Sequence, residues 1–204
     1  MSKANLFVIF APSGAGKTSL VKTVVDSTND IQVSVSHTTR DQRPGEIDGI
    51  HYHFVKENEF QALTNDGDFL EQAEVFGHSY GTSQTWVEQA LNNGTDVILE
   101  IDWQGAQQVR KLLPCINICI LPPSIDTLRS RLNARGQDNK ETIEGRMQEA
   151  LDEISHYNEA DYIIINDDFD TAKRELKSIV VASRKRTALQ TIRHQQLLSE
   201  LFNG

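Results

Sequence analysis

The 204-residue chain has no long apolar run and no excess of basic residues. Its apolar runs fall well short of the roughly 20 residues that a membrane helix needs. The N-terminal segment MSKANLFVIFAPSGAGK lacks the layout of a secretory signal, because its apolar part ends after a few residues. With 29 acidic against 20 basic residues, a broad nucleic-acid footprint is not expected. These absences predict a cytoplasmic protein without a membrane or nucleic-acid partner.

Cysteine is also scarce. Cys115 and Cys119 are the only two, and both lie in the apolar segment LPCINICILPP. Neither has the additional Cys or His pair that a zinc site requires, and the six histidines show no ligand spacing. We therefore expect both cysteines to act as small buried hydrophobic side chains.

Short apolar segments alternate with helical patterns along most of the chain. This alternation predicts an α/β fold with a parallel sheet covered on both faces. Strands are expected over residues 5–11, 31–36, 96–102, 116–123 and 160–167. Helices are expected over residues 17–26, 85–94 and 124–136 with Ser124 as N-cap, over 137–157 behind a polar loop, and from 168 as the last helix.

The segment APSGAGKT, residues 11–18, lies where an expected strand turns into an expected helix. Glycines there allow backbone N–H groups to approach a phosphate, and the helix N-terminus adds its positive dipole end. The lysine can reach the β- and γ-phosphates, and the hydroxyl of the Thr that follows it can ligate Mg²⁺. The pattern predicts a nucleotide triphosphate site built from Ala11, Pro12, Ser13, Gly14, Ala15, Gly16, Lys17 and Thr18, although Ala11 stands where the usual motif has Gly.

Residues 36–84 differ in composition from their flanks and are interpreted as an inserted lobe. They begin with SHTTRDQRPGEIDGIHYHF, in which Arg40 and Arg43 stand beside hydroxyl groups and before a Pro-Gly turn. Guanidinium groups form bidentate bonds to phosphate that lysine cannot form. The stretch therefore indicates a site for a small, doubly charged anion.

Together, APSGAGKT, TTRDQRPGEIDGIHYHF, FLEQAEVFGHSYGTS, LEIDWQG, RLNARGQD and INDDFD resemble the guanylate kinase family, and the bacterial form in particular. The resemblance covers residues 4–184 as one guanylate kinase-like domain. It implies a three-layer P-loop NTPase core formed by residues 1–35 and 85–204, a GMP-binding lobe over 36–84, and a helical lid near 136–145. It further implies Mg²⁺-dependent phosphoryl transfer from ATP to GMP, giving ADP and GDP.

The resemblance also implies individual roles. The GMP phosphate would be held by Arg40, Arg43 and Tyr52 with support from Ser36 and Tyr80, and guanine would be read by Glu71, Thr82 and Asp102. Whether Thr82 or Ser83 reads guanine O6 stays open, because the family more often has Ser at the first position. Lys17, Arg131, Arg135 and Arg146 would be catalytic, Asn166 would lie by the adenine, and Thr18 would hold Mg²⁺. Whether Glu100 or Asp102 approaches Mg²⁺ is left open.

Other interpretations remain at this stage. Arg40 and Arg43 could form surface ion pairs with Asp41, Glu46 or Asp48, and Asp102 could be only a helix cap. Glu71 could be a solvated acid at a helix end. The lid arginines could pair with neighbouring glutamates. The chain as a whole could be a ribose 1,5-bisphosphate phosphokinase, a non-catalytic guanylate kinase-like module that binds phosphopeptides, or a nucleotide-dependent switch. Its oligomeric state is left open.

Overall fold

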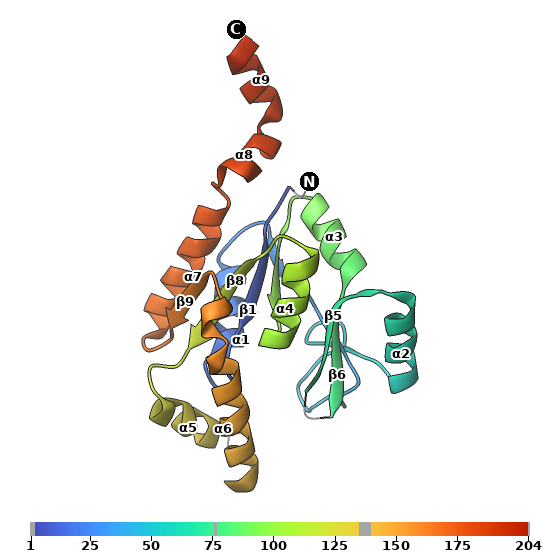
Figure 1. Ribbon diagram of the computed structural model, residues 1–204, viewed down its shortest axis with the longest axis vertical. Helices are drawn as coiled ribbons and strands as arrows, with labels where there is room; N and C mark the ends of the chain where they lie inside the picture. Colours follow the sequence, from blue (N-terminus) through green and yellow to red (C-terminus); the bar gives the residue numbers. More distant parts are fainter. Residues whose placement is uncertain (1–2, 76, 135–139, 204) are drawn as a thin grey trace.

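The computed structural model describes residues 3–75, 77–134 and 140–203. Its core is a parallel sheet of five strands in the order β2-β7-β1-β8-β9 (Figure 1). The strands are β1 (Leu6–Phe10), β2 (Ile31–Val33), β7 (Asp96–Glu100), β8 (Ile116–Leu121) and β9 (Tyr162–Ile165). β1 lies at the centre and is buried along its whole length, as its uninterrupted apolar sequence LFVIF requires of a strand covered on both faces.

Helices cover both faces of this sheet. Phe7 and Ile9 of β1 pack with α1 (Lys17–Asp26) and α7 (Phe169–Ser183). Val8 and Phe10 point to the opposite face and pack with α3 (Gln84–Asn92) and α4 (Trp103–Leu112). The predicted α/β class and three-layer core are confirmed, and so are the five expected strands, although their ends differ.

Two local predictions were wrong. The strand expected over 31–36 ends at Val33, and beyond it the Ser34 N–H still donates to the Ile98 carbonyl of β7 at 2.9 Å. The helix expected from residue 168 is not the last, since α8 (Thr187–Arg193) and α9 (Gln195–Asn203) follow α7. α4, which begins directly after Asp102, was not predicted from the sequence. The Asp102 carboxylate accepts a hydrogen bond from the Gly105 N–H at 2.8 Å and so caps α4.

A second, smaller sheet lies between β2 and β7 in chain order. Its strand order is β4-β3-β6-β5, formed by β3 (His37–Thr38), β4 (His53–Phe54), β5 (Phe69–Val75) and β6 (His78–Ser83). Among the described residues, the one helix within this segment is α2 (Glu57–Asp66), which ends at Gly67 with φ +73°. Figure 1 shows this sheet and α2 standing to one side of the core.

On the other side of the core, α5 (Ile125–Ala134) and α6 (Lys140–Ser155) form a helix pair with its own apolar cluster. Ser124 caps α5, as predicted, by accepting from the Thr127 N–H at 3.0 Å. The C-terminal end of α6 is attached to α4. There the His156 ring stacks on Trp103, with 3.6 Å between ring centroids, and Gln107 donates to both carboxylate oxygens of Glu159.

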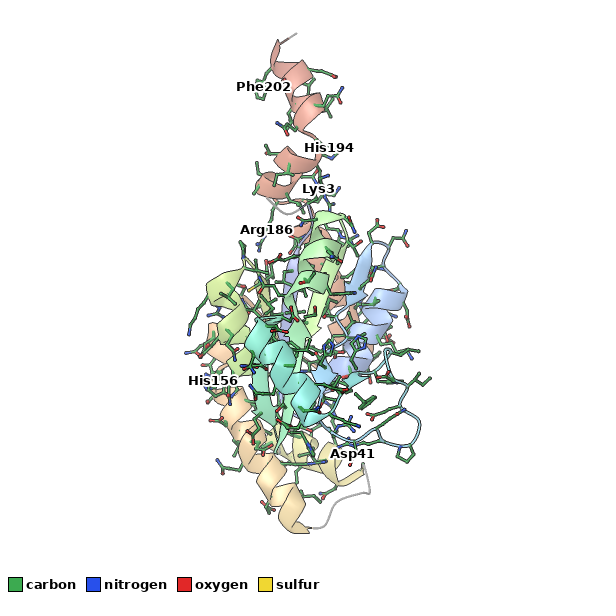
Figure 2. The ribbon with its side chains drawn as sticks, turned by 90° about the vertical axis from the view of Figure 1, so that its right-hand side faces the viewer. Lys3, Asp41, His156, Arg186, His194 and Phe202 are labelled. Carbon is green, nitrogen blue, oxygen red and sulfur yellow. The ribbon has the colours of Figure 1, made fainter. Side chains whose placement is uncertain are left out.

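One buried ion pair joins the end of α7 to the start of β7. The fully buried Asp96 accepts from Arg184 Nε at 2.7 Å and from the Asn5 N–H at 2.7 Å. Beyond it, α8 and α9 project away from the core, and Phe202 near the tip is 87% exposed (Figure 2). Cys119 is buried in β8 and Cys115 is half-buried, both as free thiols, which agrees with the packing role expected for them. Within the described ranges, no helix is long and apolar enough to cross a membrane.

Candidate active site

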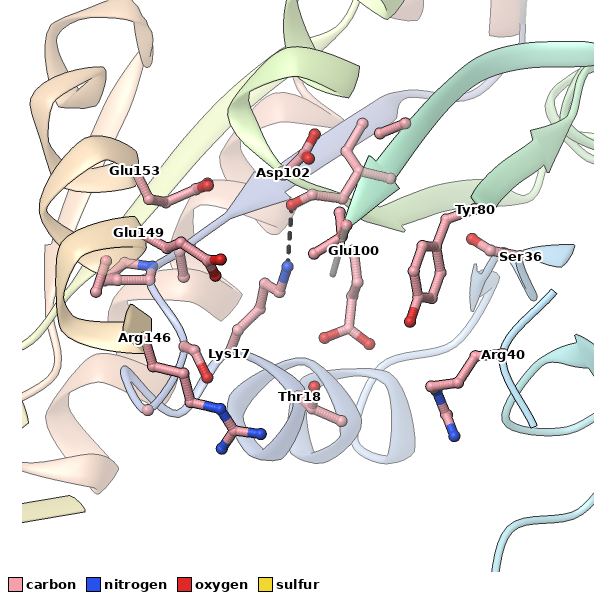
Figure 3. Close-up of a pocket in the computed structure, with 18 of the residues that line it drawn as sticks. Lys17, Thr18, Ser36, Arg40, Tyr80, Glu100, Asp102, Arg146, Glu149 and Glu153 are labelled. Carbon is pink, nitrogen blue, oxygen red and sulfur yellow. Dashed lines mark hydrogen bonds between the residues drawn. The ribbon is translucent and has the colours of Figure 1, made fainter. Parts of the chain in front are cut away.

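A cavity of about 460 Å³ lies at the carboxyl end of the core sheet, between the small sheet and α6. Figure 3 shows three groups of side chains around it. Lys17, Thr18 and Glu100 come from the core, Ser36, Arg40 and Tyr80 from the segment of the small sheet, and Arg146 from α6. Most of the expected site residues are thus brought to one cavity, whose lining includes Ala11, Pro12, Ser13, Gly14, Gly16, Lys17, Thr18, Ser36, Arg40, Arg43, Tyr52, Glu71, Tyr80, Asp102 and Arg146.

The phosphate loop connects β1 to α1 in a conformation that needs its glycines. Gly14 and Gly16 have φ of +92° and +93°, and a Cβ on Gly16 would lie 2.5 Å from Asn166 Nδ2. Gly16 is also the N-cap of α1, so the unpaired N–H groups of the helix start face the loop. Ala15 is buried beneath the loop and does not line the cavity. Because positive φ occurs at the glycines, Ala11 is tolerated at the first motif position.

Lys17 is the first residue of α1, and its Nζ donates to the Ile101 carbonyl at 3.0 Å (Figure 3). The Thr18 hydroxyl follows at the cavity rim. Glu100 ends β7, and its Oε1 is buried without a hydrogen-bond partner in the part of the chain that the structure describes. An exposed hydroxyl and an unpaired carboxylate oxygen are the donor types that Mg²⁺ prefers, so this corner of the cavity fits a divalent cation beside a triphosphate.

The opposite end of the cavity holds the expected anion ligands. Arg40 is only 10% exposed at its side chain and donates to Glu46 Oε1 at 2.8 Å, so the ion pair considered as an alternative does form. Its guanidinium nevertheless lines the cavity, while Arg43 nearby is exposed. Burial raises the pKa of Tyr52, whose neutral hydroxyl is therefore available as a hydrogen-bond donor beside Arg40.

Glu71 is a buried strand residue of β5, so its interpretation as a solvated helix-end acid was wrong. Its Oε1 accepts from the Thr82 hydroxyl at 2.5 Å, and Thr82 lies 3.4 Å from the Ser36 hydroxyl. Burial raises the pKa of Glu71 to about 7. Ser83 points elsewhere and accepts from the Trp86 N–H as the cap of α3. Thr82 is fully buried and is not among the residues that line the cavity, but of the two hydroxyl candidates it is the one that bonds to Glu71.

The remaining expected residues are placed as follows. Arg146 lines the cavity from α6. Arg131 lies behind the phosphate loop, where its Nη2 donates to the Asn166 carbonyl at 3.0 Å. Asn166 is buried and donates from Nδ2 to the Ala15 carbonyl at 2.6 Å, so its amide supports the phosphate loop. Arg135 and residues 136–139 of the expected lid lie outside the described residues.

Sequence reasoning missed two acids on α6. Glu149 and Glu153 both line the cavity, one helical turn apart. Glu153 Oε1 is buried and has no hydrogen-bond partner among the described residues, and burial raises the pKa of Glu153 to about 7. In the sequence EALDEIS these acids resemble a solvated helix face. Only their spacing relative to the buried Met147 and Ala150 could have indicated that they face inward.

Comparisons with known proteins agree on one family. The family model for guanylate kinase matches residues 3–183. The guanylate kinase of Hahella chejuensis is 58% identical over 205 residues, covering 100% of this chain and 99% of that protein. The guanylate kinase of Saccharophagus degradans is 57% identical over 199 residues, covering 97% of both chains. The crystal structure of guanylate kinase from Anaplasma phagocytophilum superposes with a TM-score of 0.76 at 32% identity, covering 92% of this chain and 90% of that one.

Proposed function

The chain belongs to the guanylate kinase family, and we propose that the cavity between the phosphate loop and the small sheet is its active site. The enzyme transfers the γ-phosphoryl group of ATP to GMP and releases ADP and GDP. The comparisons give no support to a ribose 1,5-bisphosphate phosphokinase or to a non-catalytic module. The sequence prediction of a cytoplasmic location is kept as part of this proposal.

One observation carries the assignment of the site. A single cavity is lined at one end by a phosphate loop with Lys17 and at the other end by Arg40, Arg43 and Glu71. The first end has the groups for a triphosphate, and the second has those for a phosphate and a guanine ring. Donor and acceptor would therefore meet within one cavity, as direct phosphoryl transfer requires.

At the donor end, backbone N–H groups of residues 11–18 would cradle the β- and γ-phosphates. Lys17 would exchange its bond with the Ile101 carbonyl for the phosphate oxygens, so that its charge moves with the transferring group. Thr18 and Glu100 would hold Mg²⁺, which neutralises phosphate charge when bound. Asn166 would fix the loop through the Ala15 carbonyl, with a further contact to adenine as the family implies.

At the acceptor end, Arg40, Arg43 and Tyr52 would bind the GMP phosphate, supported by Ser36 and Tyr80. A phosphate monoester has a second pKa near 6 and is mostly dianionic at neutral pH. Its oxygen therefore attacks the γ-phosphorus without a general base, while the bond from that phosphorus to the β–γ bridging oxygen breaks. Charge on the transferring group would be stabilised by Lys17 and by the expected arginines Arg135 and Arg146. Arg131 would join them only by giving up its bond to the Asn166 carbonyl.

Guanine offers two donors, N1–H and N2–H₂, and one acceptor, O6, on its Watson–Crick edge. Glu71 would accept from the donor pair, with its carboxylate oriented by the hydroxyl of Thr82. Asp102 would add a second carboxylate nearby. Two donors facing Glu71 stabilise its ionised form, which opposes the effect of burial on its pKa.

We further propose that the domain division expected from the sequence holds. Residues 1–35 and 85–204 would be the P-loop core, 36–84 the GMP lobe, and the segment near 136–145 the lid over ATP.

Incubation with ATP, Mg²⁺ and a panel of acceptors tests the proposed activity and its acceptor. ADP formation with GMP should exceed that with AMP, with other nucleoside monophosphates and with ribose 1,5-bisphosphate. Indifference of the enzyme to GMP would overturn the proposal.

A further inference from the structure

Gly105 stands between the two carboxylates that face the base end of the cavity. It lies in the first turn of α4 and is buried. Its N–H donates to Asp102 Oδ1 at 2.8 Å. A Cβ built on Gly105 would lie 2.7 Å from Glu71 Oε2, closer than real Cβ contacts come. The absence of a side chain at this position is therefore what allows the Glu71 carboxylate to lie against α4.

The backbone around Glu71 has little freedom to move away from α4. Gln108, one helical turn after Gly105, donates from Nε2 to the Gln72 carbonyl at 2.8 Å. Its Oε1 accepts from the Gln72 N–H at 3.1 Å, so one side chain pairs with both backbone groups of the residue next to Glu71. On the other side of Glu71, Leu70 is buried in the core cluster that includes Ala106 and Val109 of α4.

The Glu71 side chain is held as firmly as its backbone. Oε1 accepts from Thr82, and Oε2 occupies the space above Gly105. A methyl group on Gly105 would meet Ile101 Cδ1 at 3.2 Å and Asp102 Oδ1 at 3.4 Å as well. The Ile101 contact is with the flexible end of a side chain, whereas the carboxylate of Glu71 has Thr82 on its other side. Displacement of Glu71 is therefore the main response to a side chain at position 105.

We propose that Gly105 is a specificity-determining positioning residue, which by lacking a side chain sets the Glu71 carboxylate at the α4 N-terminus beside Asp102 for guanine. The inference rests on the proposed function, because it takes the base at this end of the cavity to be guanine. Gly105 itself touches no substrate in this scheme. It acts through Glu71, which receives the guanine donors, and through Asp102, which its N–H orients.

The central experiment replaces Gly105 with Ala and measures both substrates. Gly105→Ala should raise the Kd of GMP, measured by isothermal titration, at least tenfold and lower the ratio of kcat/KM for GMP over AMP by a similar factor. The KM for ATP should change less than twofold, because the phosphate loop is untouched. Unchanged GMP affinity in a folded Gly105→Ala variant would overturn the inference.

Testing Gly105→Ala in Glu71→Ala protein distinguishes a clash with the Glu71 carboxylate from a general disruption of α4. In Glu71→Ala protein the contacting oxygen is gone, so adding Gly105→Ala should leave the Tm unchanged or higher, whereas Gly105→Ala alone should lower it. This comparison holds even if Gly105→Ala alone does not fold. If adding Gly105→Ala lowers the Tm by the same amount in wild type and in Glu71→Ala protein, Gly105 has a packing role only and the inference fails.

A shorter acid supplies the matched rescue. Glu71→Asp withdraws the carboxylate by one methylene, so Gly105→Ala should weaken GMP binding much less in this background than in wild type. If the factors by which Glu71→Asp and Gly105→Ala each weaken GMP binding simply multiply in the double variant, the two residues are not directly coupled. Gly145, a helical glycine of α6 with no atom within 4 Å of a built Cβ, is the Tm control, and Gly145→Ala should raise the Tm. If wild type does not phosphorylate GMP, the proposed function fails, while the predicted Tm coupling between Glu71 and Gly105 is still measurable.

Discussion

The two ends of the cavity are built in different ways. The donor end is one continuous segment, residues 11–18, whose backbone groups and helix start face the cavity, and it rests on the buried strand β1. The acceptor end is assembled from side chains on separate pieces of chain, including strands of only two residues. Its geometry depends on side-chain bonds such as Arg40 to Glu46 and Thr82 to Glu71. The difference predicts that single changes at the donor end affect chemistry, while those at the acceptor end affect binding and base choice.

The largest effect is expected for Lys17→Ala at the donor end. Removing a preorganised charge from the transferring group should lower kcat by about two to three orders of magnitude. Stability should fall by only about 1 kcal/mol, because the folded protein loses the hydrogen bond to the Ile101 carbonyl. Steady-state kinetics and thermal unfolding measure the two effects. GMP affinity is the control and should stay within about twofold if the ends are separate. A kcat close to that of wild type would remove Lys17 from the donor site.

Next in size is Glu71→Gln at the acceptor end. The amide keeps the shape and an oxygen for Thr82, but it presents an N–H₂ group toward the guanine donors. We expect kcat/KM for GMP to fall by about one to two orders of magnitude, with the KM for ATP unchanged. Kinetics with GMP and AMP measure the change in base choice. A GMP-to-AMP ratio equal to that of wild type would exclude Glu71 from base recognition.

Arg43→Lys should have a smaller effect that is confined to the acceptor. A point charge replaces a bidentate guanidinium, and the loss of one charged hydrogen bond should raise the KM for GMP about tenfold. The KM for ATP should not change. Arg40→Lys is the matched comparison, because Arg40 also pairs with Glu46 and its replacement should lower the Tm as well. Equal changes in both KM values for Arg43→Lys would contradict the division between the two ends.

The smallest effect concerns Glu153 and is seen in stability. Burial raises the pKa of Glu153 from 4.5 to about 7 in the folded protein, so the folded state binds its proton more tightly than the unfolded state does. This contribution to the free energy of unfolding is fully present below pH 4.5 and is lost as the pH rises to about 7. Lys17 opposes the shift, whereas Asp102 and Asp152 add to it.

Glu153→Gln removes this titration. At pH 8 the variant should be more stable than wild type by about 1–2 kcal/mol, since each pKa unit corresponds to about 1.4 kcal/mol and partial exposure reduces the full effect. At pH 4 the two proteins should have nearly the same free energy of unfolding. Urea unfolding across this pH range measures both. A constant difference between the proteins at all pH values would show that the Glu153 carboxyl is not desolvated in the folded state.

The donor and acceptor ends of the cavity also differ in how far the sequence predicts them. β1, α1 and the phosphate loop could be predicted because periodicity, the glycines and the motif lie within a few consecutive residues. α4 was missed because the apolar strand DVILEID runs directly into it, and Asp102 was weighed as a helix cap without the helix after it being predicted. The arginine stretch indicated an anion, but only the resemblance to a family assigned the acids their roles.

The remaining features depend on contacts between distant segments. The burial of Glu71 comes from α4, which begins about 30 positions later in the sequence, and no local pattern separates it from a surface acid. The burial of Glu153 is equally hard to predict. Met147 and Ala150 define the apolar face of α6, but the sequence does not say what the neighbouring face packs against. Gly105 shows no local sign that glycine is required, because its φ is ordinary and the closest clash of a side chain there is with the distant Glu71 carboxylate.

The stacked rings of Trp103 and His156 attach the C-terminal end of α6 to α4. α6 has 16 residues and is held at its C-terminal end through the Trp103 stack and the Gln107–Glu159 bonds. At a rise of about 1.5 Å per residue α6 is roughly 24 Å long, so a tilt of about 10° about its attached end would carry the N-terminal end through about 4 Å. α5 packs on α6 through Leu128, Leu132, Met147 and Ala150 and would travel with it. Arg146 lies further from the attached end than Glu153 does, so the same tilt would move Arg146 further.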